Sequence, residues 1–520
     1  MHSSKTALAS GNISTRQIIG LFGGIPIFLV IWALPISDSL EPDAQKTLAV
    51  ASLMAWWWIT EALPIPATSL IPVVAFPLLN IMKEKDVVLA YADSNIFLFM
   101  GGFFLAMAMQ KWRLHRRIAL QIIKAIGLGP RKIILGFMVA TAFLSMWISN
   151  TATTMMMYPI GLAIILQLTS FKNDQGQPLN AVVISRFQIA LMLGIAYAAS
   201  VGGIGTKIGT PPNIVFAAAV KTLFPEAPEI GFLQWMLLGI PLVILFIPVI
   251  WFVLTHITQP IRIRQLPGSK DVIAEQLKQL GPMQRGERLV LIIFIFTAMA
   301  WIFRKNIELG TFTIPGWSNL LGVAASVNDA TVAIFSALLL FAIPVKLREK
   351  SFLLDWEWAV KIPWGILLLF GGGIALASGF QTTGLAAWVG SQLMLFSNVP
   401  LILMILITCL MLTFLTEVTS NTATATIFMP ILAATALAIG IHPFLLMVPA
   451  TISASCAFML PVATPPNAII FGAGCVTIPQ MAKNGVLLNF IGVVIVTLIV
   501  YTIAIPAFGI MLGSLPEWIK

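Results

Sequence analysis

The sequence predicts an all-α polytopic membrane protein with about 11 transmembrane helices and two re-entrant hairpins, arranged as inverted repeats. Of its 520 residues, 58% are hydrophobic and only 10% are charged, whereas a soluble chain carries about 25% charged residues. Many apolar runs reach the roughly 20 residues that a helix needs to cross a bilayer. Two copies of Ser-Asn-Thr-Ala-Thr, at 149–153 and 420–424, interrupt this apolar sequence. Such polar residues are costly inside a membrane and are usually functional.

The N-terminal part is predicted to supply a tail and a first span within residues 1–45. No small-residue cleavage site follows the apolar run at about 19–36, so we expect this run to be retained as a span. The first half of the chain, 46–257, continues with spans at about 46–60, 64–82 and 94–110. The basic segment 111–124 is either an amphipathic helix in the membrane interface or a basic loop.

Two apolar arms, at about 133–147 and 155–169, flank the first polar tip at 149–151. Each arm is shorter than the ~20 residues of a full span, so the pair predicts a re-entrant hairpin. The alternative is one spanning helix that tolerates a polar patch. A second pair of arms, within about 400–438, flanks the second tip at 420–422 in the same way.

The helix that follows each tip is predicted to break, at 202–213 in the first half and at 461–467 in the second. Both breaks contain Thr-Pro-Pro-Asn. Proline removes a backbone hydrogen-bond donor and clashes with the preceding turn, so neither helix can continue through its break. A broken helix at membrane depth is tolerated only where it faces protein or a water-filled cavity.

The most polar segment, 258–288, is predicted to be a cytoplasmic linker, and the second half occupies 289–520. The other spans are expected from near Gln188 and at about 232–257, 289–304, 330–345, 362–380, 443–473 and 484–513. Eleven spans place the basic clusters at 111–117, 258–288 and 346–350 on one side. The positive-inside rule makes this side cytoplasmic, with the N-terminus there and the C-terminus outside. This bias also accounts for the net charge of +10, and no nucleic-acid partner is indicated.

The two halves share an internal spacing that predicts a repeat. Gly102 stands 48 residues before Asn150, and Gly373 stands 48 residues before Asn421. A polar loop at 171–186 is present in the first half alone. The predicted topology lets the first tip enter from inside and the second from outside, so the repeats are inverted. Inverted repeats with paired broken helices indicate a transporter whose site lies near the membrane midplane.

The four interruptions together predict a site for an anion and for cations. Helix N-termini carry a partial charge of roughly +0.5 and bind carboxylate groups, while unwound carbonyls suit a small cation. Neither tip and neither break contains Arg. A dianion would therefore need co-bound cations to offset the cost of leaving water. The alternative is that these small polar residues only help helices to pack.

These motifs, together with Thr60-Glu-Ala-Leu-Pro64, resemble the divalent anion/sodium symporter family, the sodium-coupled di- and tricarboxylate carriers. The resemblance covers the chain from about residue 50 to its end. It implies a homodimer in which a scaffold domain holds a moving transport domain, which is an elevator-type mechanism. Sodium ions would be the co-transported partners.

Carried over position by position, the resemblance implies two sodium sites and one substrate site. The first sodium site would comprise Ser145, Ser149, Asn150 and the carbonyl of Gly209. The second would comprise Thr416, Thr419, Asn421 and Ala463. The substrate carboxylates would meet Asn150, Thr151 and Thr210 on one side, and Ser420, Asn421, Thr422, Thr464 and Pro465 on the other.

Two charged residues near these positions leave alternatives open. Lys207 stands two residues before Gly209, and its repeat partner is Pro461. Its ammonium group either replaces one cation and so modifies coupling, or reaches the cytoplasmic opening or pairs with an acid. Glu417, beside the second tip, is either a proton site or a structural acid.

The expected function is uptake of a C4 dicarboxylate such as succinate, malate or fumarate, coupled to sodium. The alternative is a sodium-independent antiporter for dicarboxylates or citrate, and the sequence does not separate dicarboxylates from tricarboxylates or sulfate. An enzyme is not indicated, because neither GxSxG nor HExxH occurs. The expected location is the lipid bilayer of the bacterial inner membrane.

Overall fold

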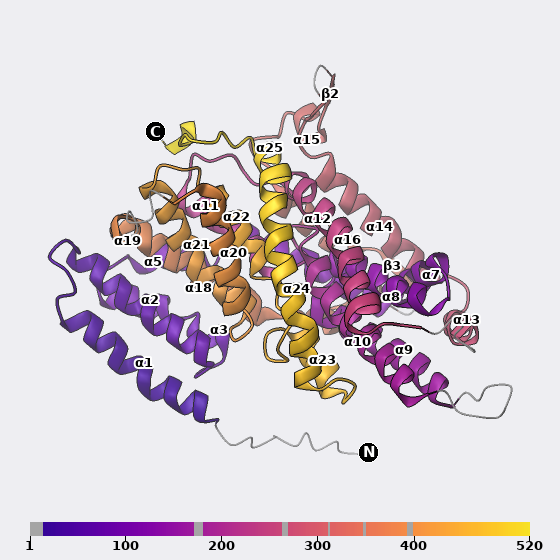
Figure 1. Cartoon of the computed structure of the whole chain (residues 1–520). Coiled ribbons are helices and arrows are strands. Elements are labelled where there is room, and N and C mark those ends of the chain that lie inside the picture. Colours follow the sequence, from indigo (N-terminus) through magenta and orange to yellow (C-terminus); the bar gives the residue numbers. More distant parts are fainter. Residues whose placement is uncertain are drawn as a thin grey trace, which may run out of the picture.

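The computed structural model describes residues 14–170, 180–262, 269–309, 312–346, 350–392 and 399–519. These residues form a predominantly helical molecule, as predicted (Figure 1). The N-terminal tail up to residue 13 and most of the predicted polar loop at 171–186 lie outside the described residues.

The N-terminal helices form a pair at one edge of the molecule (Figure 1). Helix α1 (Thr15–Ala33) packs along α2 (Pro42–Thr60). A capping box starts α1: the hydroxyl of Ser14 accepts from the backbone N–H of Gln17, and the side chain of Gln17 accepts from the backbone N–H of Ser14. This reciprocal pairing satisfies two of the free donors at the helix start.

The span predicted at about 64–82 is divided. The chain instead forms α3 (Ile65–Thr68), α4 (Ile71–Leu78) and α5 (Glu84–Ala90). Pro66 and Pro72 stand in the first turns of α3 and α4, where a missing N–H costs no hydrogen bond. Each proline therefore begins a short helix. Helix α6 (Ser94–Lys111) follows, close to its predicted bounds.

The basic segment after α6 is a helix and not a loop, which decides between the two alternatives. In α7 (Leu114–Ile126), Leu114, Leu120 and Ile123 are buried against the rest of the protein. Arg117 on the same helix pairs with Glu287. A helix with one apolar and one basic face fits a membrane interface, and its position there stays a prediction.

Helix α10 lies at the centre of the first half. The helices of this region are α8 (Pro130–Ser145), α9 (Asn150–Ser170), α10 (Ala181–Gly203), α11 (Pro211–Leu223) and α12 (Phe232–Phe252), which continues as a π-helix over Val253–Thr258. Every residue of α10 from Ile189 to Gly203 is buried. Because α8, α9 and α12 pack around it, the break that follows Gly203 lies deep inside the protein.

The middle of the chain contains two expected helices and several short elements that the sequence did not predict. Helices α14 (Arg285–Ile302) and α16 (Asp329–Ala342) match the spans predicted at about 289–304 and 330–345. Helix α13 (Ser269–Leu280), within the predicted linker, and the short helices α15 (Trp317–Leu320) and α17 (Trp356–Ala359) were not expected. Two antiparallel pairs of strands also form, β1 (Ile307–Leu309) with β2 (Phe312–Ile314), and β3 (Pro344–Lys346) with β4 (Ser351–Phe352). The all-α prediction is wrong for these short connections, because strands of two or three residues leave no periodic pattern in a sequence.

The second half repeats the helix order of the first half around its tip and its break. Its helices are α18 (Trp364–Thr382), α19 (Leu385–Gln392), α20 (Leu401–Leu415), α21 (Asn421–Ala438), α22 (Phe444–Ser453), α23 (Pro465–Gly472) and α24 (Ile478–Ile499). A π-helix (Val500–Ala504), α25 (Ile505–Ala507) and a 3-10 turn (Glu517–Ile519) end the described chain.

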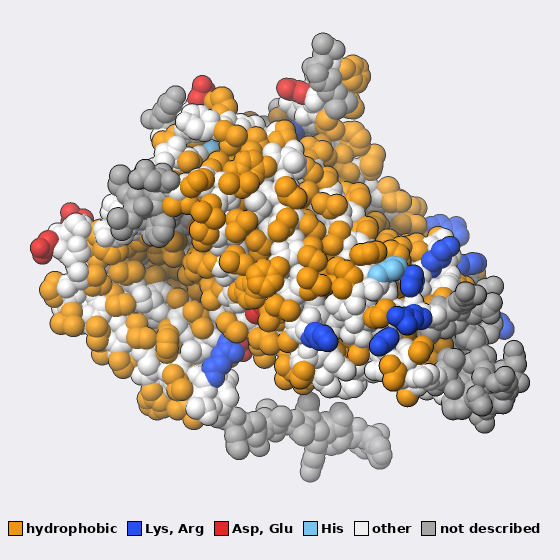
Figure 2. Space-filling model, viewed as in Figure 1, with side chains coloured by type: hydrophobic (Ala, Val, Ile, Leu, Met, Phe, Trp, Pro, Cys, Tyr) orange, Lys and Arg blue, Asp and Glu red, His pale blue; other side chains and the backbone are white. Residues whose placement is uncertain are grey.

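Eight helices in the described part of the chain are long and apolar enough to cross a membrane, and four shorter apolar helices have 10–17 residues. The count of about 11 spans, the re-entrant course of the hairpins and the inverted arrangement stay predictions. Figure 2 shows a broad hydrophobic face, with Lys and Arg mostly over its lower and right parts and Asp and Glu mostly at its upper and left margins. This separation of charge agrees with the prediction that one side of the membrane is the basic one.

Candidate functional site

Both tips and both breaks border one cavity of about 600 Å³. Every residue predicted to meet the substrate lines it: Asn150, Thr151, Thr210, Ser420, Asn421, Thr422, Thr464 and Pro465. Three of the predicted sodium ligands, Ser149, Gly209 and Ala463, line it as well. The structure therefore brings together segments that lie more than 300 residues apart in the sequence.

Four helices begin at this cavity. The first residues of α9, α11, α21 and α23 are Asn150, Pro211, Asn421 and Pro465, and all four line it. The first turn of a helix carries a partial positive charge. In α9 and α21 it also has backbone N–H groups, whereas α11 and α23 begin with Pro-Pro, which has no N–H at the first two positions. Four such ends around one space suit an anion with more than one acidic group.

The cavity has almost no charged side chains of its own. Among the described residues that line it, Glu61 is the one charged side chain. The position of Glu61 at the site was not expected from the sequence, although the Thr-Glu-Ala-Leu-Pro motif contains it. Since no Lys or Arg is found among these lining residues, a bound dianion would depend on helix ends, hydroxyl groups and co-bound cations.

Behind each tip lies a cluster of three oxygen atoms that share a single proton. The hydroxyl of Ser145 lies 2.6 Å from Asn150 Oδ1 and 2.7 Å from the carbonyl oxygen of Ala199. The hydroxyl of Thr416 lies 2.8 Å from Asn421 Oδ1 and 3.0 Å from the carbonyl oxygen of Ala454. One hydroxyl proton satisfies one acceptor at a time, so each cluster retains free lone pairs that a small hard cation can use.

Gly203 brings the backbone of the first break close to this first cluster. A Cβ atom on Gly203 would stand 2.7 Å from Asn150 Oδ1 and 3.0 Å from the carbonyl oxygen of Gly209. Two of the predicted ligands of the first sodium site therefore lie within 3.0 Å of one point. Only the absence of a side chain at Gly203 leaves that space open.

The sequence model of the sodium:sulfate symporter transmembrane region matches residues 15–515 of this chain. The chain belongs to the sodium:sulfate symporter family. It is a transporter and not an enzyme, as predicted, and the family's description agrees with co-transport of sodium ions.

Curated relatives of this symporter family are similar over almost their whole length. The sodium-dependent dicarboxylate transporter SdcS of Staphylococcus saprophyticus is 45% identical over 496 residues, 95% of this chain and 92% of that protein. SdcS of Staphylococcus aureus is 46% identical over 498 residues, 96% of this chain and 93% of that protein. The resemblance to sodium-coupled carriers that the motifs indicated is thereby confirmed.

Two solved transporters share the fold at low sequence identity. The efflux pump MtrF of Neisseria gonorrhoeae has a TM-score of 0.56 and 12% identity, over 91% of this chain and 97% of that chain. The YdaH transporter of Alcanivorax borkumensis has a TM-score of 0.52 and 11% identity, over 95% of this chain and 99% of that chain. At this identity the likeness concerns the fold alone.

In this member of the symporter family, matching asparagines hold the two breaks. The side-chain amide of Asn213 donates to the carbonyl oxygens of Gly203 and Thr206, at 3.2 and 2.7 Å. That of Asn467 donates to the carbonyls of Ala457 and Leu460, at 3.2 and 3.1 Å. Both asparagines belong to the Thr-Pro-Pro-Asn motif, so the last residue of the motif bonds to backbone carbonyl groups of the loop that precedes the two prolines.

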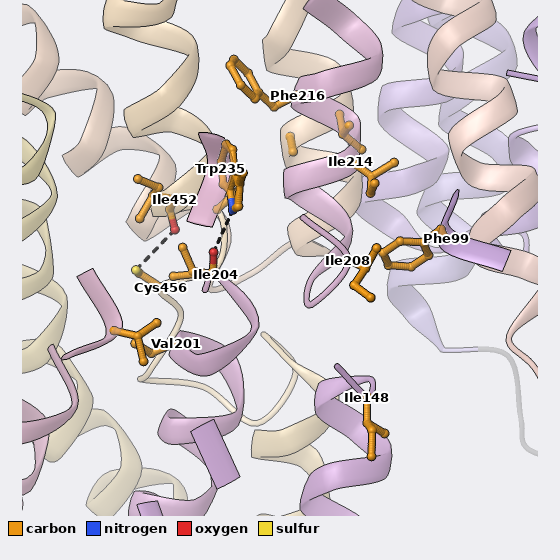
Figure 3. Packing of buried hydrophobic residues seen from close by; sticks show 14 of the residues in the cluster. Phe99, Ile148, Val201, Ile204, Ile208, Ile214, Phe216, Trp235, Ile452 and Cys456 are labelled. Atoms are coloured by element: carbon orange, nitrogen blue, oxygen red, sulfur yellow. Dashed lines mark hydrogen bonds between the residues drawn. The ribbon is translucent and has the colours of Figure 1, made fainter. Parts of the chain in front are cut away.

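Hydrophobic packing fixes the first break from both sides (Figure 3). Trp235 on α12 donates its indole N–H to the carbonyl oxygen of Ile204 at 2.8 Å. Ile208, at the cavity, lies beside Phe99 of α6 (Figure 3). A Cβ on Gly102 would lie 3.2 Å from Ile208, so this glycine also allows the close approach. The segment between α10 and α11 is thus buried and well packed.

Glu417 has a structural role in this symporter. Its Oε1 accepts from the backbone N–H groups of Phe458 and Met459 at 2.7 and 2.9 Å, and its Oε2 accepts from that of Leu460 at 3.0 Å. The amide of Asn489 donates to Oε1 at 2.8 Å. The carboxylate therefore satisfies three consecutive backbone donors of the second break, which is the structural alternative of the two considered.

Four predicted residues lie away from the cavity. Ser145, Thr416 and Thr419 stand behind the tips, and the hydroxyl of Thr419 lies 2.6 Å from that of Thr424. Lys207 is buried, and its Nζ donates to the carbonyl of Ile230 at 2.7 Å and faces Asp329 Oδ2 at 3.4 Å. Of the alternatives for Lys207, pairing with an acid is the one that its contacts match.

Proposed function

We propose that this transporter takes up C4 dicarboxylates such as succinate, malate and fumarate together with sodium. Its relatives in two Staphylococcus species, at 45–46% identity, are named sodium-dependent dicarboxylate transporters. The observation that carries the proposal is the cavity itself: four helix N-termini for carboxylates, two oxygen clusters for cations, and no positively charged side chain among the described lining residues. Co-bound sodium would supply the positive charge that the protein does not.

The proposed ligand sets follow from the two clusters and the four helix ends. The first sodium ion would be held by Ser145, Ser149, Asn150 and the carbonyl of Gly209, and the second by Thr416, Thr419, Asn421 and Ala463. The dicarboxylate would bind between the helix starts, at Asn150, Thr151 and Thr210 on one side and Ser420, Asn421, Thr422, Thr464 and Pro465 on the other. Each asparagine would then contact a cation with its oxygen and the anion with its amide.

The proposed mechanism is an elevator movement in a homodimer. The elements that carry the tips and breaks pack extensively on one another: α9 and α23 on α10, α21 on α11, and α22 on α20 and α21. Such a body can move as a unit against the remaining helices. The proposed location is the bacterial inner membrane, with the N-terminus in the cytoplasm, the C-terminus outside, and the halves 46–257 and 289–520 as inverted repeats.

Uptake of labelled succinate into proteoliposomes tests the proposed function. We expect uptake to require an inward sodium gradient and not to require internal succinate. Unlabelled malate and fumarate should compete more strongly than citrate or sulfate. Uptake that ignores sodium and requires internal succinate would instead establish the antiporter. Asn421→Ala is the variant expected to abolish uptake, and Lys361→Met, in a loop outside the cavity with its Nζ over the ring of Trp358, is the matched control.

A further inference from the structure

A buried network of ion pairs lies beside the first break, outside the central cavity. Lys207 and Asp329 are 3% and 2% exposed, and Arg304 is 2% exposed. Arg304 Nε lies 2.8 Å from Asp329 Oδ1, and its Nη2 lies 2.8 Å from Glu229. One carboxylate oxygen of Asp329 thus faces Lys207, which lies in the break, and the other binds Arg304, which follows the end of α14.

The charged side chains of this network are paired with one another and with backbone carbonyl groups, so Lys207 does not act as an isolated charge. The ammonium group of Lys207 has three protons, of which two point to the carbonyl of Ile230 and to Asp329. Burial alone would raise the pKa of Glu229, but hydrogen bonds and charge from Arg304 outweigh it and lower the pKa to about 2. A buried charge is tolerated when it is paired in this way, and losing one partner is strongly destabilising.

Lys207 connects this network with the proposed first sodium site through three residues of backbone. Gly209, whose carbonyl oxygen borders the same space at Gly203 as Asn150 Oδ1, donates its N–H to the carbonyl oxygen of Thr206 at 3.2 Å. Thr206 in turn donates its hydroxyl to the carbonyl oxygen of Met146, next to the first tip. Any shift of Lys207 would therefore displace a short, tightly bonded turn whose carbonyl oxygen faces the cation position.

The second break lacks this anchor and has a different one. The repeat partner of Lys207 is Pro461, which has no charge. There, Glu417 binds three consecutive N–H groups just before Pro461, whereas its repeat partner in the first half is Met146. Each break is thus held by one charged side chain. In the first half, Lys207 of the break pairs with Asp329 of α16, and in the second half Glu417 beside the tip accepts from backbone N–H groups of the break.

We propose that Lys207 is a positioning residue for the first sodium site, fixing the turn 206–209 to Asp329 at the start of α16. The inference rests on the proposed sodium-coupled function. It excludes the possibility that the ammonium group takes the place of a cation, because Nζ lies on a separate cavity of about 250 Å³ that Asp329 and Glu229 also line. Lys207 acts on sodium through the backbone and does not touch it.

The test is a sodium titration of succinate uptake by the full-length protein in proteoliposomes, with Lys207→Met, Lys207→Arg and Asp329→Asn. We expect Lys207→Met to raise the half-saturating sodium concentration about tenfold, since couplings of this kind change affinity by that order. The maximal rate and the number of sodium ions per succinate should stay unchanged. Lys207→Arg, which keeps the charge, should recover most of the sodium affinity, and Asp329→Asn should weaken it as Lys207→Met does.

Lys221→Met is the matched control, because Lys221 lines the same small cavity and pairs with Asp93 at 2.7 Å, but stands at the far end of α11. It should keep the wild-type sodium dependence. The sodium-induced rise in Tm of purified protein without substrate gives a second readout that does not need transport. An unchanged half-saturating sodium concentration in Lys207→Met and Asp329→Asn would overturn the inference, as would one extra sodium ion per succinate. Wild-type protein without any sodium dependence would instead refute the proposed function itself.

Discussion

Replacing Gly203 by alanine is expected to weaken the proposed first sodium site while leaving the fold in place. Gly203 is the last residue of α10, and the added methyl group would stand 2.7 Å from Asn150 Oδ1 and 3.0 Å from the carbonyl oxygen of Gly209. Ordinary carbon–oxygen contacts are about 3.3–3.6 Å, so these two oxygens must move outward by roughly 0.3–0.9 Å. Both are proposed ligands of the same cation.

The magnitude follows from where the strain is relieved. Inserting a methylene-sized group into a packed interior costs about 1–3 kcal/mol. Without sodium, Asn150 and the turn at Gly209 can shift to accommodate the methyl group. With sodium they must return to ligand positions, so the cost falls mainly on the bound state. A cost of this size corresponds to a loss of about 5- to 150-fold in affinity.

The assay is the sodium dependence of succinate uptake, together with the sodium-induced shift in Tm. We expect Gly203→Ala to raise the half-saturating sodium concentration by about 5- to 150-fold. Gly194→Ala is the matched control on the same helix, because its methyl group would meet the flexible side chain of Met138 at 3.1 Å. The reasoning is refuted if Gly203→Ala protein is folded and responds to sodium at wild-type concentrations.

Three further predictions concern the anion site, the second break and the ion-pair network. Thr151→Val and Thr422→Val each remove one hydroxyl from the cavity. Since a hydrogen bond to a charged group contributes about 1.5–3 kcal/mol, the KM for succinate should rise about 10- to 150-fold in each variant. An unchanged KM in both variants would contradict the proposed binding mode. Glu417→Gln turns an amide N–H toward backbone N–H groups and should lower the Tm of purified protein by about 1–3 °C. If transport instead loses its pH dependence at an unaltered Tm, Glu417 is a proton site. Burial raises the pKa of Glu229, but the hydrogen bond and charge of Arg304 outweigh this effect and lower the pKa to about 2. The stabilisation by Glu229 is therefore complete above its unfolded pKa of about 4.3 and is lost as pH falls toward 2. The difference in Tm between wild type and Glu229→Gln should therefore be constant from about pH 5.5 to 8, and a difference that vanishes at pH 6 would argue against the ion pair with Arg304.

Features that depend on local sequence could be predicted. The start of α9 at Asn150 and of α21 at Asn421 follows from a polar tip inside apolar sequence. The starts of α11 and α23 follow from Pro-Pro, which suits the first turn of a helix because its missing N–H groups cost no hydrogen bond there. Since spacing relates these four positions, the sequence also predicted that the same residues would gather around one site.

Features that depend on distant contacts could not be predicted. Glu61 lines the cavity because the turn after α2 packs near α18, and no local pattern indicates that approach. Lys207 and Asp329 are 122 residues apart, so the sequence showed a charged residue near the site but not its partner. The sequence left two roles open for Glu417, because the groups that donate to its carboxylate are backbone N–H groups of a loop 41–43 residues away.

The two proposed sodium sites are not equivalent, although their oxygen clusters match. The repeat partner of Gly203 is Ala457, so the second half already carries the methyl group that is expected to damage the first. The difference lies in the helices: α10 stays helical through Gly203, whereas α22 ends at Ser453 and Ala457 lies in non-helical backbone. The direction of Cβ follows from the local backbone, which is helical at Gly203 and non-helical at Ala457. The second half therefore accommodates its alanine by ending the helix early and binding the freed N–H groups with Glu417, while the first half keeps the helix and depends on glycine.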